Sequence, residues 1–145
     1  MKEEILIIKN KEEMADLARK LADNSKKGSV FGLKGTLGSG KSFFARAFIN
    51  ALSKEEITVS SPTFNLLNIY EIEDYLGVTK TIYHFDLYRL KNENELLNLG
   101  VEEALINGIT LIEWPEIAKN FCRNNYTEIT IKILKDEERE VVVSS

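Results

Sequence analysis

Cysteine, histidine and proline are scarce in this sequence. Among its 145 residues there are one Cys (Cys122), one His (His84) and two Pro. A single cysteine can form neither a disulfide framework nor a cysteine-based metal site, so we expect a reducing compartment and a small buried side chain at Cys122. Long apolar runs are lacking too, because Met1-Lys2-Glu3-Glu4 is followed by only four apolar residues. This start is neither a signal peptide nor a membrane span, and we expect a cytoplasmic protein.

Basic residues are also fewer than acidic ones. The chain carries 19 basic and 23 acidic side chains, which give a formal net charge of −4. Proteins whose main ligand is RNA or DNA neutralise its phosphates with an excess of Lys and Arg, so this balance argues against such a role. With 43% apolar and 29% charged residues, the composition is that of an ordinary globular protein. The length predicts one domain, residues 1–145, which buries roughly 70% of its unfolded surface.

The most informative segment is Gly-Thr-Leu-Gly-Ser-Gly-Lys-Ser at residues 35–42, a full match to the P-loop pattern G-x-x-x-x-G-K-[ST]. Glycines let successive backbone N–H groups point at an anion, and the N-terminus of the following helix adds the positive end of its dipole. Lys41, which we expect to be mobile and solvent-facing, would bridge the β- and γ-phosphates, and the Ser42 hydroxyl would bind Mg²⁺. The predicted nucleotide-binding residues are Gly35, Thr36, Leu37, Gly38, Ser39, Gly40, Lys41, Ser42 and Phe43.

The residues around this loop have the pattern that a P-loop requires. A short apolar run at 30–33 predicts a buried strand before it, and apolar residues at helical spacing from Phe44 to Leu52 predict a helix after it. Upstream, we expect a strand at 5–8 and a helix that Asn10 caps with Glu13 as the reciprocal partner. Strand, glycine loop and helix in this order indicate a nucleotide-binding α/β protein.

The rest of the chain adds antiparallel strands. Two β-rich segments flank the turn Glu73-Asp74-Tyr75-Leu76-Gly77 and predict a hairpin. The elements that we expect downstream of the P-loop helix are strands at 66–72 and 78–85, short helices at 95–99 and 101–106, a strand at 109–112, a helix at 116–122 and strands at 128–134 and 140–143. The predicted fold is a P-loop NTPase-like three-layer α/β sandwich with a mixed, mainly parallel central sheet that carries antiparallel strands.

Two acidic residues follow strands that could neighbour the P-loop strand. Glu113 ends the strand at 109–112, in the Walker B position where aspartate is usual, and Asp86 ends the preceding strand. A P-loop requires such a carboxylate to orient Mg²⁺ and its waters. We expect both to face the γ-phosphate, with Asp86 near the metal through water and Glu113 either on the metal or orienting the attacking water. The alternative for each is a surface carboxylate at a strand end.

A bend with hydroxyl groups lies between the P-loop and these carboxylates. Ser61, Pro62 and Thr63 occupy the place where many nucleoside triphosphatases have a switch threonine that responds to the γ-phosphate. Pro62 would orient Thr63 inward. On this segment alone, an edge-strand turn with solvent-exposed hydroxyls is the better interpretation.

Three single residues stay ambiguous from the sequence. A lone histidine such as His84 is more often a hydrogen-bonded, partly buried residue than a catalyst. Arg89 either neutralises phosphate charge or pairs with a carboxylate such as Asp86 or Glu93. For Trp114, packing and a contact surface are equally good interpretations.

Together these motifs resemble the TsaE (YjeE) family, the small P-loop ATPases of bacterial tRNA threonylcarbamoyladenosine synthesis. The resemblance covers most of residues 10–120. It depends on the P-loop, which is generic, and on three motifs that in this order and spacing are specific to the family: Ser-Pro-Thr-Phe at 61–64, His-Phe-Asp-Leu-Tyr-Arg-Leu at 84–90 and Leu-Ile-Glu-Trp at 111–114.

The resemblance implies an ATPase of low intrinsic activity, with ATP or ADP and Mg²⁺ as ligands. It further implies that the protein docks on the TsaB–TsaD complex and lets that complex turn over repeatedly, with tRNA bound by the partners. The implied catalytic residues are Lys41, Thr63, Asp86 and Glu113, and the implied metal ligands are Ser42, Asp86 and Glu113. No role on DNA or a membrane is implied.

Two positions depart from the family pattern. Ser42 stands where threonine often follows the lysine, and it keeps the metal-binding hydroxyl. Thr36 stands where the family commonly has aspartate. Loss of that carboxylate would change either the hydrolysis rate or a partner contact, and the sequence leaves both open.

Other functions fit less well. Small-molecule kinases bring several arginines to the phosphoryl group from a lid, whereas the arginines here are scattered at Arg19, Arg46, Arg89, Arg123 and Arg139. A GTPase switch is formally matched by D-x-x-G at 74–77, but that match lies in a predicted turn and no N-K-x-D motif follows it. A P-loop that serves only as an interaction module would leave Lys41 and Glu113 without a role.

Overall fold

The computed structural model describes residues 2–122 and 125–145, so Arg123 lies outside the described residues. In chain order the elements are β1 (Glu3–Ile8), α1 (Lys11–Asp23), β2 (Val30–Lys34), α2 (Lys41–Leu52), β3 (Leu67–Glu73), β4 (Thr79–Asp86), α3 (Glu93–Asn98), α4 (Val101–Asn107), β5 (Ile109–Glu113), the 3₁₀ helix η1 (Pro115–Phe121), β6 (Tyr126–Lys135) and β7 (Glu138–Ser144). Most boundaries agree with the sequence pattern to within two or three residues.

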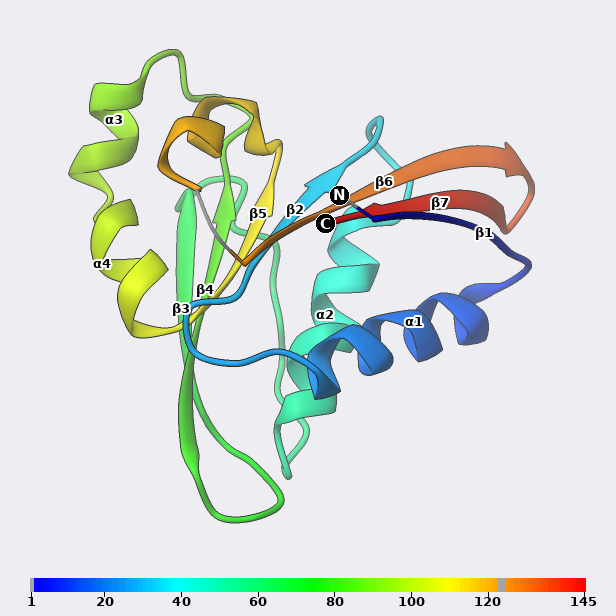
Figure 1. Ribbon diagram of the computed structural model, residues 1–145, viewed down its shortest axis with the longest axis horizontal. Coiled ribbons are helices and arrows are strands. Elements are labelled where there is room, and N and C mark those ends of the chain that lie inside the picture. The colour runs from blue at the N-terminus through cyan, green and yellow to red at the C-terminus, as the bar shows by residue number, and fades with distance from the viewer. Residues whose placement is uncertain (1, 123–124) are drawn as a thin grey trace.

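A seven-stranded sheet in the order β1-β7-β6-β2-β5-β4-β3 forms the centre of the molecule. Its middle strands, β6, β2, β5 and β4, run parallel to one another. The pairs β3–β4, β6–β7 and β1–β7 are antiparallel, and the two ends of the chain lie side by side along β1 and β7 (Figure 1). The predicted fold, with a mainly parallel centre and added antiparallel strands, is therefore confirmed.

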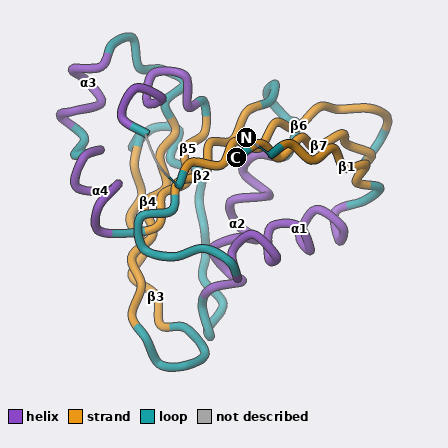
Figure 2. Tube along the Cα trace, viewed as in Figure 1, coloured by secondary structure: helices purple, strands orange, loops and turns teal. Residues whose placement is uncertain are grey.

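Helices cover both faces of this sheet (Figures 1 and 2). On one face α1 and α2 pack over a core that includes Phe44 and Phe48, and on the other α3, α4 and η1 pack over a second core that includes Leu96. Neighbouring residues of β2 serve opposite layers, because Phe31 belongs to the first core and Val30 to the second. This alternation is what a strand buried on both faces requires.

Two local details differ from expectation. The Asn10 side chain accepts the Glu13 N–H at 2.9 Å, as predicted for the cap, but the Glu13 carboxylate accepts from the Lys9 N–H at 2.8 Å rather than from the cap residue. The helix expected at 116–122 is the 3₁₀ helix η1. Trp114 precedes it with a left-handed backbone (φ 58°), and proline is tolerated at the first position of the helix because its missing N–H would be unpaired there anyway.

The parallel strands bring their carboxyl ends to one edge of the sheet. The P-loop follows β2, Asp86 ends β4 and Glu113 ends β5, which lies between β2 and β4. All three sequence-predicted parts of the site therefore lie at the same edge. Within the described ranges, no helix is long and apolar enough to cross a membrane.

Substitution of Phe48 tests how much the packing of the P-loop helix α2 on the first core contributes to stability. Its ring is fully buried, 5.0 Å from the ring of Phe31 and 6.3 Å from that of Phe44 between centroids. We expect Phe48→Ala to lower the free energy of unfolding by about 3–5 kcal/mol, because the cavity it leaves adds to the lost burial. Urea denaturation measures this. Leu76→Ala, at a side chain that is 89% exposed, is the control and should change stability by less than about 0.5 kcal/mol.

Candidate functional site

The P-loop is packed against the strand beside it, which explains its first glycine. Gly35 has φ 151°, and a Cβ built there would lie 2.6 Å from the Ile131 carbonyl oxygen of β6 and 2.5 Å from the Ser39 Oγ. No side chain fits in that space. At its other end Gly40 caps α2 with φ 119°, and the first N–H groups of such a helix are free to bind an anion.

Lys41 is buried, contrary to the expectation of a mobile, solvent-facing side chain. It is 5% exposed, and its Nζ donates to the carbonyl oxygens of Gly35 (2.6 Å) and Thr36 (3.0 Å). The same ammonium lies 4.4 Å from the ring centroid of Trp114. Burial lowers the pKa of Lys41 below its ordinary value, although nearby carboxylates, Glu113 first, oppose this shift. The charged form is thus held by carbonyl oxygens and an aromatic face, and a bound anion would stabilise it further.

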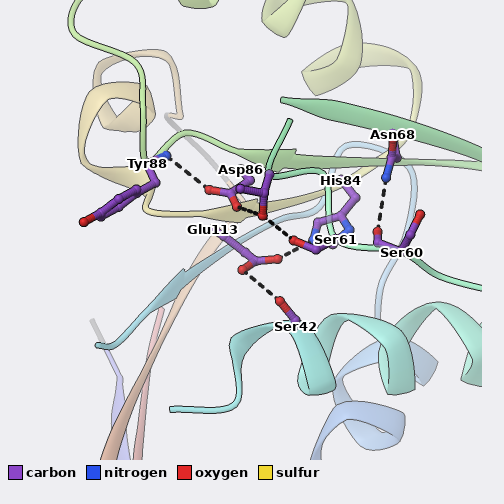
Figure 3. Close-up of polar contacts among 9 residues, drawn as sticks. Ser42, Ser60, Ser61, Asn68, His84, Asp86, Tyr88 and Glu113 are labelled. Carbon is purple, nitrogen blue, oxygen red and sulfur yellow. Dashed lines mark hydrogen bonds and ion pairs between the residues drawn. The ribbon is translucent and has the colours of Figure 1, made fainter. Parts of the chain in front are cut away.

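The two predicted carboxylates are neighbours. Asp86 and Glu113 are register partners at the ends of β4 and β5, and they are only 6% and 3% exposed. The alternative of surface carboxylates is therefore wrong for both. Figure 3 shows them on the same side of the sheet, above the start of α2. Two buried carboxylates on paired neighbouring strands provide the hard oxygen ligands that a divalent cation prefers.

Each carboxylate is oriented by hydrogen bonds. For Glu113, Oε2 lies 2.7 Å from the Nε2 of His84, and Oε1 accepts a long hydrogen bond of 3.4 Å from the Ser42 hydroxyl (Figure 3). For Asp86, Oδ1 accepts the Tyr88 N–H at 3.1 Å and Oδ2 accepts from the Thr63 hydroxyl at 3.3 Å. Ser42 and Thr63 therefore each contact one of the two carboxylates.

The bend at 61–64 turns the hydroxyl of Thr63 inward, whereas Ser61 is exposed. Thr63 is half-buried, and its Oγ1 lies 2.7 Å from the Ser61 Oγ, while Pro62 is buried. Solvent-exposed hydroxyls were the better interpretation of this segment alone, and the bond from Thr63 to Asp86 shows that interpretation to be wrong for Thr63. Phe64 points outward and is 81% exposed, with the Arg89 guanidinium 4.9 Å from its ring centroid. Arg89 therefore lies over an aromatic ring rather than on a carboxylate.

A cavity of about 250 Å³ joins these parts. Its walls are Leu37, Gly38, Gly40, Lys41, Ser42 and Phe43 of the P-loop segment, with Ser61, Thr63, Asp86, Glu113 and Trp114 opposite. All predicted catalytic and metal-binding residues thus meet at one cavity. Of the predicted nucleotide-binding residues, Gly35, Thr36 and Ser39 are not part of its lining.

Sequence reasoning missed two contacts that hold the site. One is the pairing of His84 with Glu113, for which the only signal was a polar residue two positions before Asp86, between the apolar residues Ile82 and Phe85. The other is Arg139 of β7, whose Nε donates to the Ser39 carbonyl oxygen at 2.9 Å and so joins the C-terminal hairpin to the P-loop. No local pattern links residues so far apart in the chain.

The D-x-x-G segment at 74–77 has a structural role. Asp74 Oδ1 accepts the N–H groups of Leu76 and Val78, each at 2.9 Å, and these bonds close the turn between β3 and β4. The turn precedes β4, whereas Asp86 ends that strand, so it lies at the opposite end of the hairpin from the cavity. The D-x-x-G segment therefore forms a hairpin turn and does not take part in the site.

A P-loop between a parallel strand and a helix, with carboxylates at the ends of two neighbouring parallel strands, defines a P-loop NTPase-like α/β protein. The family model "Threonylcarbamoyl adenosine biosynthesis protein TsaE" matches residues 8–141. The chain belongs to the TsaE family.

Individual relatives agree with this assignment. A Rickettsia felis protein named tRNA threonylcarbamoyladenosine biosynthesis protein TsaE is 42% identical over 135 residues, which cover 93% of this chain and 76% of that protein. The Bacillus subtilis protein of the same name is 34% identical over 137 residues, covering 94% and 82%. The crystal structure of Bacillus subtilis YdiB is similar to the fold, with a TM-score of 0.74, 29% identity, and coverage of 98% of this chain and 84% of that one.

The contact between the P-loop and β6 can be tested with two glycines of the loop. Gly35→Ala places a Cβ against a backbone carbonyl, so we expect it to lower the free energy of unfolding by about 3 kcal/mol or more. Gly38→Ala is the matched control, because Gly38 has φ 79° but nothing within 4 Å of its Cβ position. That variant should show only the backbone strain of about 1–2 kcal/mol. Equal losses in urea denaturation would contradict the close packing at Gly35.

Proposed function

We propose that this chain is a Mg²⁺-dependent ATPase that supports repeated rounds of tRNA threonylcarbamoyladenosine modification by acting on the TsaB–TsaD complex. The observation that carries the proposal is the meeting of Lys41, Ser42, Thr63, Asp86 and Glu113 at one cavity beside the P-loop. The part in tRNA modification is supported by the family and by the names of the relatives.

The side chains present fit a nucleoside triphosphate with Mg²⁺. The P-loop segment supplies backbone N–H groups and an ammonium for phosphate oxygens together with the Ser42 hydroxyl, and the rest of the lining includes two carboxylates. Mg²⁺ takes few protein ligands and keeps its other positions for water and phosphate oxygens, so Ser42, Asp86 and Glu113 are a sufficient set. When bound, the ion would neutralise charge on the β- and γ-phosphates.

The chain's own residues have distinct parts in this proposal. Lys41 exchanges its two carbonyl acceptors for phosphate oxygens, which gives a partly desolvated cation a full counter-charge. Glu113 orients the attacking water or the water of the metal through the oxygen that faces the cavity. Thr63, which contacts Asp86, responds to the γ-phosphate in this proposal, because a bound triphosphate and a bound diphosphate would offer its hydroxyl different partners.

Partner control is supported by the surface around the cavity. Leu37, Phe64 and Tyr88 are 70%, 81% and 55% exposed. Leu37 lines the cavity, Phe64 follows Thr63, and the Tyr88 ring packs on Trp114 with 4.8 Å between centroids. Apolar side chains gathered at the edge of a polar site are typical of a protein contact surface. The net charge of −4 agrees with the proposal that the partners bind the tRNA. We place this function in the cytoplasm, with no role on membranes or DNA.

Substitution of the carboxylates tests the chemistry. We expect Glu113→Gln and Asp86→Asn each to lower kcat for ATP hydrolysis by about 100-fold or more, because both act on the reacting end of the triphosphate. Affinity for ADP, which lacks the γ-phosphate, should change little. Phosphate release and calorimetric titration with ADP measure the two effects, and Lys41→Ala is the control that should lose affinity for both nucleotides. If the carboxylate variants keep kcat but lose both affinities, they serve binding only.

Partner control is tested by measuring phosphate release with and without purified TsaB–TsaD complex. We expect slow hydrolysis alone and acceleration by the complex. Thr63→Val removes the hydroxyl at nearly constant volume and should keep nucleotide binding but lose most of the acceleration, whereas Thr63→Ser keeps the hydroxyl and the response. Equal rates with and without partner for all variants would rule out the gated mechanism. Fast hydrolysis by the chain alone, or transfer to a small acceptor, would favour a stand-alone enzyme such as a kinase.

A further inference from the structure

We infer that His84 is a positioning residue for Glu113: it holds one carboxylate oxygen so that the other faces the cavity. The inference rests on the proposed function, since it assigns a task within that same site. It goes beyond it because His84 does not line the cavity and would touch neither nucleotide nor metal.

The contact is short and shielded from solvent. His84 is fully buried in β4, and its Nε2 lies 2.7 Å from Oε2 of Glu113, itself 3% exposed (Figure 3). An ionised carboxylate can only accept hydrogen bonds, so the imidazole hydrogen is on Nε2 when Glu113 is ionised. In the neutral imidazole, Nδ1 is then the bare acceptor. It is buried and, among the described residues, has no hydrogen-bond partner.

This pattern indicates what the histidine contributes. A buried nitrogen without a partner costs stability that an apolar side chain would not, and two neighbours of His84 on this face, Ile82 of β4 and Leu111 of β5, are apolar and fully buried. Among the residues that the structure describes, the one polar contact of the His84 side chain is with Glu113. The imidazole is therefore best explained by that carboxylate rather than by the packing of the core.

The two oxygens of Glu113 have unequal partners. Oε2 is held by His84 at 2.7 Å, whereas Oε1 has, within the described part of the chain, only the 3.4 Å contact with the Ser42 hydroxyl. The first bond fixes the plane of the carboxylate, and the second is too long to do so alone. Without His84, Glu113 would sample other rotamers, and the oxygen offered to a metal or its water would lose its fixed direction. Outer partners of metal-binding groups commonly act in this way.

Three substitutions separate positioning from packing. His84→Leu removes the donor. His84→Gln places an amide N–H the same number of bonds from Cβ as the imidazole Nε2, so it can reach Glu113. His84→Asn carries the same amide one bond closer to the backbone and falls short. We expect the Leu and Asn variants to lower kcat about 10-fold with unchanged affinity for metal-free ADP, and the Gln variant to recover most of the loss.

A second readout does not require turnover. Mg²⁺ titration of the ATP complex, followed by the fluorescence of Trp114 beside Lys41, should give an apparent Mg²⁺ affinity about 10-fold weaker for His84→Leu and His84→Asn than for wild type and His84→Gln. In a Glu113→Gln background, His84→Leu should have no further effect on either quantity, because the carboxylate it positions is gone.

The possible outcomes distinguish the positioning role of His84 from the proposed ATPase function. A wild-type chain that hydrolyses no ATP with or without partner would overturn the proposed function, and the Mg²⁺ titration would still decide on His84. An active wild type with unchanged kcat and Mg²⁺ affinity in His84→Leu would overturn the positioning role. Equal losses of kcat and Mg²⁺ affinity in His84→Gln and His84→Asn would also overturn the positioning role. The same holds if His84→Leu still lowers either quantity in the Glu113→Gln background. Thermal melts of all variants identify any that fail to fold.

Discussion

The parallel pairing of β2, β5 and β4 is the constraint on which the site depends. It brings the P-loop and the carboxyl ends of two further strands to one edge, and its register sets Asp86 directly beside Glu113. A shift of one residue in either strand would turn its carboxylate to the opposite face of the sheet, into the second hydrophobic core. Burial on both faces fixes the register, so the packing of two apolar layers also determines the geometry of the charged site.

The charged groups buried at this edge have polar partners within the site. Lys41 is held by the P-loop carbonyls and the Trp114 ring, and Glu113 by His84. Both arrangements are local substitutes for a ligand's charge. They let the chain fold with its polar groups in place, while leaving a cation whose acceptors are neutral and a carboxylate with one weakly held oxygen. A ligand that brings anionic and cationic charge together improves both contacts, which is the physical basis for expecting a metal–phosphate complex here.

The sequence predicted features that depend on neighbours along the chain. The P-loop strand and helix, the turn at 73–77 and the Asn10 cap follow from apolar periodicity, glycine and local side-chain bonds, and each is present. The sequence could not show that Lys41 is buried, that Thr63 turns inward, or that His84 and Arg139 hold the site, because these depend on strand order and on contacts between distant segments. For Glu13, local chemistry allowed two N–H partners only one residue apart, and the pattern did not distinguish them.

The arrangement of each motif explains how a buried site can communicate with a partner. In the bend at 61–64, Thr63 faces Asp86 while the next residue, Phe64, is exposed. After β4, Asp86 faces inward while Tyr88, whose N–H holds the same carboxylate, presents its ring outward. Inward and outward side chains therefore share short backbone segments. Under the proposed partner control, a change in the contacts of either inward residue would reach the exposed ring on the same segment, and a protein bound to those rings would act on the hydroxyl and carboxylate by the same route.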